Sequence, residues 1–214
     1  MLNPAGLLAA LLTPLFFSAA ALAADDVHDA PVRAWPGIGA GYKPGGGVLV
    51  VPQIAFSVPF FDALEPEVMM GLGVNATASS LELVNRFSFG LRWFVPVAGA
   101  GAFDVDEPVR PFLWTAIHHG HKVSGSDVLK NPIGALLTQP TAGVGHLTGV
   151  EGGVGVLLAL PVDGEHWPLL VRFGASWLPS FAAIQQDHSD GSHGGDDVLL
   201  LVDVAVGLPL SLNR

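Results

Sequence analysis

The fold is decided by a stretch that reads LELVNRFSFGLRWFV over residues 81–95. Its odd-numbered positions are apolar except for Asn85. Its even-numbered positions include the charged residues Glu82, Arg86 and Arg92. Because successive side chains of a β-strand point to opposite faces, this segment predicts a strand with one apolar and one charged face. Strands with an apolar outside and a polar inside are typical of β-barrels in membranes.

The same alternation recurs along the chain, and clusters of Gly, Pro, Asp and Ser separate the alternating segments. We therefore expect an all-β protein, an eight-stranded antiparallel up-and-down transmembrane β-barrel over residues 32–212. The interior of so small a barrel is filled by side chains. The expected strands lie near residues 32–42, 47–58, 67–76, 81–95, 110–119, 144–160, 169–178 and 197–212.

The composition favours a membrane protein over a soluble one. Hydrophobic residues make up 50% of the 214 residues and charged residues 13%, whereas about 25% charged is usual for soluble domains. No run of about 18 apolar residues follows the N-terminal segment, which argues against a helical membrane protein. The alternative is a soluble eight-stranded barrel or sandwich. Its polar face would carry Lys and Glu, but the three lysines of this chain all fall in predicted loops.

The N-terminal segment predicts a cleavable signal peptide over residues 1–23, followed by a short tail over residues 24–31. An apolar stretch covers Leu7–Phe17, and Ala21–Ala23 supplies the small residues of a cleavage site. An uncleaved anchor helix is the alternative. The chain has no Cys, which excludes disulfides, thiolate metal sites and a lipidated N-terminus. Its net charge is −10 and its few basic residues form no stripe, so nucleic-acid binding is not expected.

With the signal peptide, the alternation and the final segment Val198–Leu212, the chain resembles the small eight-stranded outer-membrane barrels of Gram-negative bacteria, the OmpA-like and OmpX-like group. The resemblance implies a multi-pass protein of the outer membrane, monomeric, with outer-membrane lipids and the barrel assembly machinery as partners. It also implies periplasmic termini, with the segments 43–46, 77–80, 120–143 and 179–196 outside. Those barrels usually end in an aromatic residue, whereas this chain has leucines there.

Aromatic residues cluster near the predicted strand ends, as the aromatic belts of membrane proteins do. We expect them to lie at the membrane interfaces. They are Trp35, Tyr42, Phe60, Phe61, Trp93, Phe94, Trp167 and Trp177.

Charged residues on the polar faces predict a network inside the lumen, since a charge in a confined space needs a partner. Alternatively, these groups could line a gated polar path for small solutes. The predicted network consists of Arg33, Glu67, Glu82, Arg86, Arg92, Glu151, Arg172 and Asp203.

Six histidines gather near the predicted outer end of the barrel and are candidate ligands for a transition metal or a pH-sensing site. Alternation places His119 and His121 on one face and His118 on the other. Solvated loop tips are the simpler interpretation. The six are His118, His119, His121, His146, His188 and His193.

The segment His146–Gly149 resembles the His-x-Ser motif of outer-membrane lipid A deacylases, with Thr148 where the nucleophilic Ser belongs. Glu151 points to the other face and is poorly placed to orient His146. The signatures G-x-S-x-G, the P-loop and the dinucleotide fingerprint are absent.

We therefore assign no catalytic residue and no cofactor, and we expect a non-enzymatic barrel with a structural, surface-display or adhesion role. The alternatives are an enzyme acting on lipid A or phospholipid, and a narrow channel or metal-binding barrel.

Overall fold

The computed structural model describes residues 32–43, 47–59, 63–76, 81–95, 109–131, 133, 145–162, 165–178 and 197–210. The predicted signal peptide and N-terminal tail lie outside these residues. The elements are β1 (Val32–Lys43), β2 (Gly47–Ser57), β3 (Leu64–Ala76), β4 (Leu81–Phe94), β5 (Val109–Ser124), α2 (Gly125–Lys130), β6 (Gly145–Val162), β7 (Glu165–Leu178), β8 (Asp197–Val206) and β9 (Leu208–Leu210).

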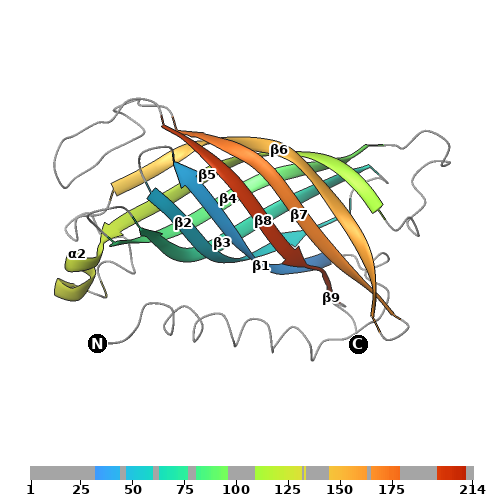
Figure 1. Cartoon of the computed structure of the whole chain (residues 1–214), viewed down its shortest axis with the longest axis horizontal. Coiled ribbons are helices and arrows are strands. Elements are labelled where there is room, and N and C mark those ends of the chain that lie inside the picture. Colours follow the sequence, from blue (N-terminus) through green and yellow to red (C-terminus); the bar gives the residue numbers. More distant parts are fainter. Residues whose placement is uncertain are drawn as a thin grey trace.

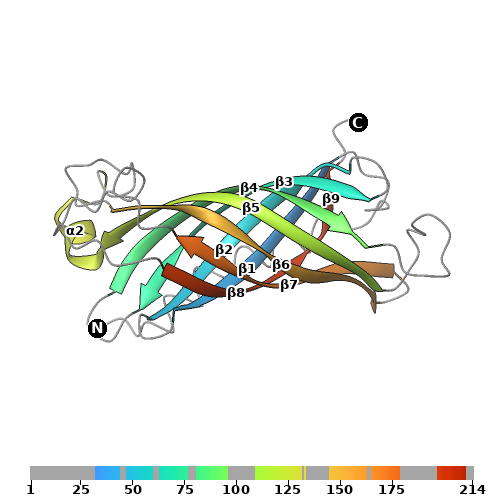
Figure 2. The same cartoon turned by 90° about the horizontal axis from the view of Figure 1, so that it is seen from above.

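From β1 to β8, each strand pairs antiparallel with the next strand of the chain, and β1 also pairs with β8, so the sheet closes on itself. β9 continues the pairing of β8 along β1 in the same register. The two are one strand interrupted at Gly207, whose N–H donates to the Pro168 carbonyl at 2.8 Å. The result is the predicted eight-stranded up-and-down barrel, with strands oblique to its long axis (Figures 1 and 2).

Three strands extend by three or more residues beyond their predicted limits. β5 continues to Ser124 instead of ending near His119, β3 begins at Leu64 instead of residue 67, and β7 begins at Glu165 instead of residue 169. The polar run from His118 to Lys122 indicated a loop, but β5 is paired there on both sides, with β4 and β6. The hydrogen bonds of a β-ladder join backbone groups, so β5 can continue as a strand through polar residues.

A short helix, α2, follows β5 directly and marks one end of the barrel (Figure 1). The Ser124 side chain caps it by accepting a hydrogen bond from the Asp127 N–H at 3.2 Å. Among the described residues, no helix has both the length and the apolar character that crossing a bilayer requires.

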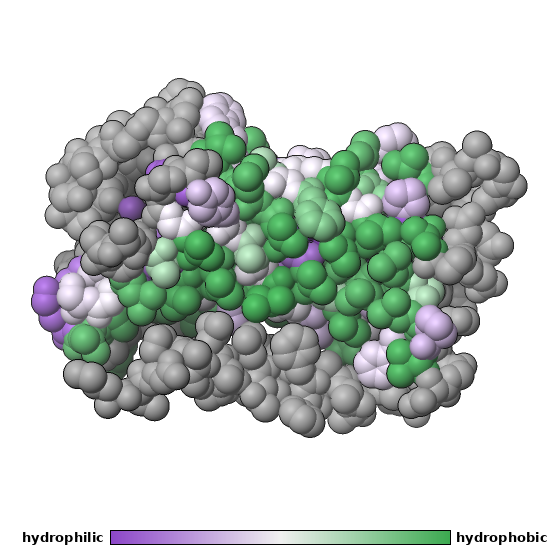
Figure 3. Space-filling model, in the orientation of Figure 1, coloured by the Kyte–Doolittle hydropathy of each residue, from purple (hydrophilic) through white to green (hydrophobic). Residues whose placement is uncertain are grey.

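The outer wall of the barrel is an apolar surface, visible as the green band over the strands in Figure 3. Phe89 is 60% exposed and Ile117 64% exposed. On β5 the outward positions from Val109 to Ile117 are apolar except for Thr115. That stretch of roughly nine residues matches the length with which a tilted strand crosses a bilayer.

The lumen holds an apolar cluster as well as charges. Phe112 and Trp114 of β5 point inward and Ile117 outward, which settles the facing of that strand. The buried members are Trp35, Ala55, Met69, Phe94, Phe112, Trp114, Leu157, Leu170, Leu201 and Ala205.

The predicted aromatic belts need one correction. Trp35 and Phe94 are buried in the lumen, because they fall on the inward-facing positions of β1 and β4. Tyr42, Trp93 and Trp177 are exposed on the outside, as predicted. Trp167 is half-buried, and Phe60 and Phe61 lie outside the described residues.

Candidate functional site

The centre of the lumen is crossed by a chain of buried ion pairs that begins at Arg92. Its guanidinium is fully buried, with Nη1 3.2 Å from Glu65 Oε2 and Nε 3.1 Å from Glu67 Oε2. Arg33 Nη1 donates to the other oxygen of Glu65 at 2.8 Å. The Ser57 hydroxyl also donates to Glu65, at 3.1 Å. Residues of β1, β2, β3 and β4 are therefore joined inside the barrel.

A second arginine extends the chain to the far wall. Arg172 of β7 pairs with Glu67 and lies with Nε 3.3 Å from Asp203 Oδ2 on β8. The Gln53 amide donates to the other Asp203 oxygen at 3.0 Å. We call this set of residues the lumenal network. It comprises Arg33, Gln53, Glu65, Glu67, Arg92, Arg172 and Asp203.

The lumenal network is neutral, because its three arginines face three carboxylates. Aromatic rings cover the arginines that cross the lumen. The Arg92 guanidinium lies 4.8 Å from the Trp35 ring and the Arg172 guanidinium 4.9 Å from the Trp114 ring. Rings at such distances stabilise a cation. The buried charges of the lumenal network are thus balanced by neighbours of opposite sign.

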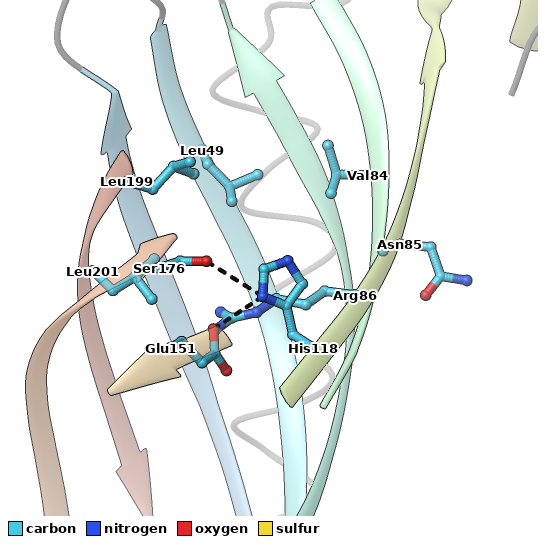
Figure 4. A pocket seen from close by; sticks show the side chains of 10 residues that line it. Leu49, Val84, Asn85, Arg86, His118, Glu151, Ser176, Leu199 and Leu201 are labelled. Atoms are coloured by element: carbon cyan, nitrogen blue, oxygen red, sulfur yellow. Dashed lines mark hydrogen bonds and ion pairs between the residues drawn. The ribbon is translucent and has the colours of Figure 1, made fainter. Parts of the chain in front are cut away.

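Nearer the α2 end, a separate polar cluster surrounds Arg86. Arg86 of β4 pairs with Glu151 of β6 across the barrel. His118 Nδ1 lies 3.5 Å from Glu151 Oε2 and 3.3 Å from the Ser176 hydroxyl. These four side chains gather in the close-up of Figure 4.

This cluster borders a small cavity of about 40 Å³, whose other lining includes the apolar side chains of Leu49, Val84 and Leu199. At roughly 10–15 Å³ for each water, it has room for a few water molecules. The Asn85 side chain points away from it, toward the outer wall (Figure 4).

The predicted charge network is thus divided by the structure. Arg33, Glu67, Arg92, Arg172 and Asp203 join one chain of contacts, and Arg86 with Glu151 forms a second group. Among the described contacts of the lumen, Glu82 joins neither group. It lies near the α2 end of β4, where the Asn75 amide donates to it at 2.8 Å.

Sequence reasoning missed two inward charges. Glu65 was overlooked because β3 was predicted to begin only at residue 67, although Glu65 shares the alternation of Glu67. Arg110 is buried with its guanidinium 4.4 Å from the Phe94 ring. Arg110 alternates with Phe112 and Trp114 along β5, so its side chain faces the lumen as theirs do.

The predicted metal ligands are separated by the barrel wall. His118 is buried in the lumen, whereas His119 is exposed on the outer wall and contacts His121. His146 is the register partner of His121 on β6. His188 and His193 lie outside the described residues. The six predicted residues therefore cannot form one site.

Thr148, which the sequence placed in the His146–Gly149 motif, contacts a histidine of the neighbouring strand β5. Its hydroxyl lies 2.7 Å from His119 Nδ1, on the outer wall. Glu151 is buried on the lumenal side with Arg86, so it cannot orient a histidine on the outside.

No family model matches the sequence, and no curated protein matches it. Among solved structures, Neisserial surface protein A (NspA) superposes with a TM-score of 0.52 at 12% identity, covering 84% of this chain and 96% of that one. The N-terminal barrel domain of Pseudomonas aeruginosa OprF gives 0.44 at 9% identity, covering 84% and 98%. Ail, the attachment invasion locus protein of Yersinia pestis, gives 0.39 at 8% identity, covering 83% and 96%. The chain shares the fold of the small eight-stranded outer-membrane barrels.

Proposed function

We propose that this protein is a non-enzymatic, monomeric barrel of the outer membrane, closed to solutes, with a structural, surface-display or adhesion role. The observation that carries the proposal is the lumenal network, which links β1, β2, β3, β4, β7 and β8 across the interior. A solute on the barrel axis would have to break several buried ion pairs at once, and breaking one costs several kcal/mol.

The apolar outer wall supports the membrane location. Monomeric soluble proteins rarely expose apolar patches larger than a few hundred Å². Here large apolar side chains are exposed on strands all around the barrel, from Val48 on β2 to Val204 on β8. A bilayer is the surrounding that stabilises such a wall.

The orientation is part of the proposal. With periplasmic termini, α2 and the connections at its end of the barrel face the outside, and they would carry surface display or adhesion. The opposite end, with the start of β1 and the end of β9, would face the periplasm.

Two other functions, a narrow channel and an enzyme acting on lipid, are less well supported. A narrow channel needs a continuous polar path, whereas the lumenal network places buried ion pairs across the interior. An enzyme acting on lipid needs a base held by an orienting group beside its nucleophile. Glu151, the acidic residue of that hypothesis, lies on the wrong face.

The test is conductance in planar lipid bilayers. We expect the purified wild-type barrel to give no steady current in potassium chloride. The double variant Glu65→Ala with Arg92→Ala keeps the lumen neutral but removes its central contacts, so it should conduct. A steady wild-type current would contradict the closed lumen and favour the narrow channel.

A further inference from the structure

The outer wall carries a polar site that the closed-barrel function does not use. Along the hydrogen-bonding direction, Phe89, Ile117 and Val150 form one apolar row of register partners. The next row toward α2 contains Phe87, His119 and Thr148, and the row beyond it contains Asn85 and His121. On the outward face of β5, polar residues therefore replace apolar ones from His119 toward α2.

Two imidazoles face each other there. His119 and His121 are alternate residues of β5, so both belong to its outward set. Their rings are edge-on, with centroids 4.5 Å apart and an angle of 85°. The two Nε2 atoms are 3.0 Å apart.

That separation is the one that a shared metal ion requires. With bonds of about 2.0–2.1 Å, two nitrogen ligands of one ion lie about 2.9 Å apart at a right angle and about 3.3 Å apart in a tetrahedron. The observed distance lies in this interval without any movement of the strand. Imidazole suits Cu²⁺, Ni²⁺ and Zn²⁺, whereas Ca²⁺ and Mg²⁺ prefer oxygen.

Thr148 fixes the ring of His119 from the neighbouring strand. Its hydroxyl oxygen lies 2.7 Å from Nδ1. When Nδ1 carries the proton and donates to this oxygen, Nε2 presents its lone pair toward His121. A hydrogen bond at the second nitrogen is the usual way in which proteins orient a metal-binding histidine.

We propose that His119 and His121 bind a single divalent transition-metal ion on the outer wall, with Thr148 as a positioning residue. No group of three His, Cys, Asp or Glu side chains suited to a metal exists among the residues that the structure describes. The described residues therefore supply two imidazole ligands to the ion. The expected order of affinity is Cu²⁺ above Ni²⁺, following the general preference of nitrogen sites.

The experiment is a titration of the tag-free, full-length barrel in dodecyl maltoside with Cu²⁺, followed by calorimetry and electron paramagnetic resonance. The wild type should bind one equivalent with coupling to at least two imidazole nitrogens. H119A and H121A should each lose this equivalent. H118A is the matched control, because His118 belongs to the same strand but faces the lumen. Gel mobility before boiling verifies that each variant is folded.

T148A tests the positioning role separately. Loss of a hydrogen bond of this kind weakens metal binding by about 10–100-fold, so its dissociation constant should rise by that factor. An unchanged constant in T148A would overturn the role of Thr148. If folded H119A or H121A bound one equivalent of Cu²⁺ as tightly as the wild type does, the proposed site would be wrong.

Discussion

The outer wall and the lumen of this barrel have opposite chemistry. The exposed side chains of the wall are apolar, as at Phe89 and Ile117. The fully buried side chains of the lumen include Arg92, Glu65 and Asp203. Soluble proteins bury apolar groups and expose charges, so this inversion indicates that the surrounding solvent is lipid. The wall needs only to be apolar, whereas the lumen depends on particular partners in particular places.

Removing the central arginine should produce the largest loss of stability. Arg92→Ala removes one ion-pair partner from each of the buried carboxylates of Glu65 and Glu67. We expect the free energy of unfolding to fall by about 3–5 kcal/mol, which is the usual loss when a buried pair is broken. Urea unfolding in lipid vesicles, followed by tryptophan fluorescence, measures it. A loss below about 1 kcal/mol would be that of an exposed pair and would contradict a buried network.

A charge placed on the wall should have the next largest effect. Phe89→Arg puts a guanidinium in the middle of the apolar wall and should cost about 2–4 kcal/mol in bilayers. Leu129→Arg is the matched control, because Leu129 is 87% exposed on α2, beyond the wall. The same vesicle assay should show no change for it. Equal losses of stability at the two positions would show that Phe89 is no more surrounded by lipid than Leu129 is.

Arg86→Ala should be milder than Arg92→Ala, although both break a lumenal ion pair. Glu151 borders the small cavity, where water can solvate its carboxylate after the arginine is lost. We expect a loss of about 1–3 kcal/mol, the usual penalty for a buried polar group that loses its partner. An effect as large as that of Arg92→Ala would show that the cavity gives Glu151 no access to water.

Added side-chain volume should be tolerated less well in the apolar cluster of the lumen than at the cavity beside Arg86. Ala55→Val adds volume inside the apolar cluster and should destabilise the barrel by about 1–3 kcal/mol. Val84→Ile adds a methylene at the cavity wall, which has room for it. Paired unfolding curves should show a clear loss for the first and none for the second. A larger loss of stability for Val84→Ile than for Ala55→Val would mean that there is no free space beside Val84.

The smallest effect concerns α2, where an exposed pair can be compared with the buried ones. The Ser124 hydroxyl and then Lys130 lower the pKa of Asp127 below its usual value. Because the folded pKa is lowered, the stabilisation is complete above the ordinary carboxyl pKa and is lost as the pH falls through the lowered value. Ser124→Ala should raise the titration midpoint of Asp127, measured by carboxyl chemical shifts. Identical midpoints would contradict the hydrogen bond that the Ser124 hydroxyl donates to Asp127 Oδ2 at 2.6 Å.

The sequence predicted the closed barrel and the facing of most strands, because alternation is a local property of each segment. It could not predict which charges meet. Arg172 and Glu67 lie 105 residues apart in sequence and meet only through the registers of the intervening strands. Glu65 was missed through an error of three residues in one strand boundary. Trp35 was assigned to the outer wall because it lies near a strand end. It is two residues from Arg33, however, and therefore faces the lumen as Arg33 does.

The histidines show the same limit. Alternation separated His118 from His119 and His121, as the structure does. The contact of His119 with Thr148 depends on the β5–β6 register, which no local pattern specifies.

The inverted arrangement is tested most directly by heat modifiability. The precursor is expressed in a Gram-negative host, and outer membranes are isolated and run on a denaturing gel with and without boiling. We predict a fast-migrating band in the unboiled outer-membrane fraction that shifts upward on boiling, as a closed barrel in lipid should. A soluble periplasmic protein whose mobility does not change would contradict the account, because the apolar wall would then have to face water.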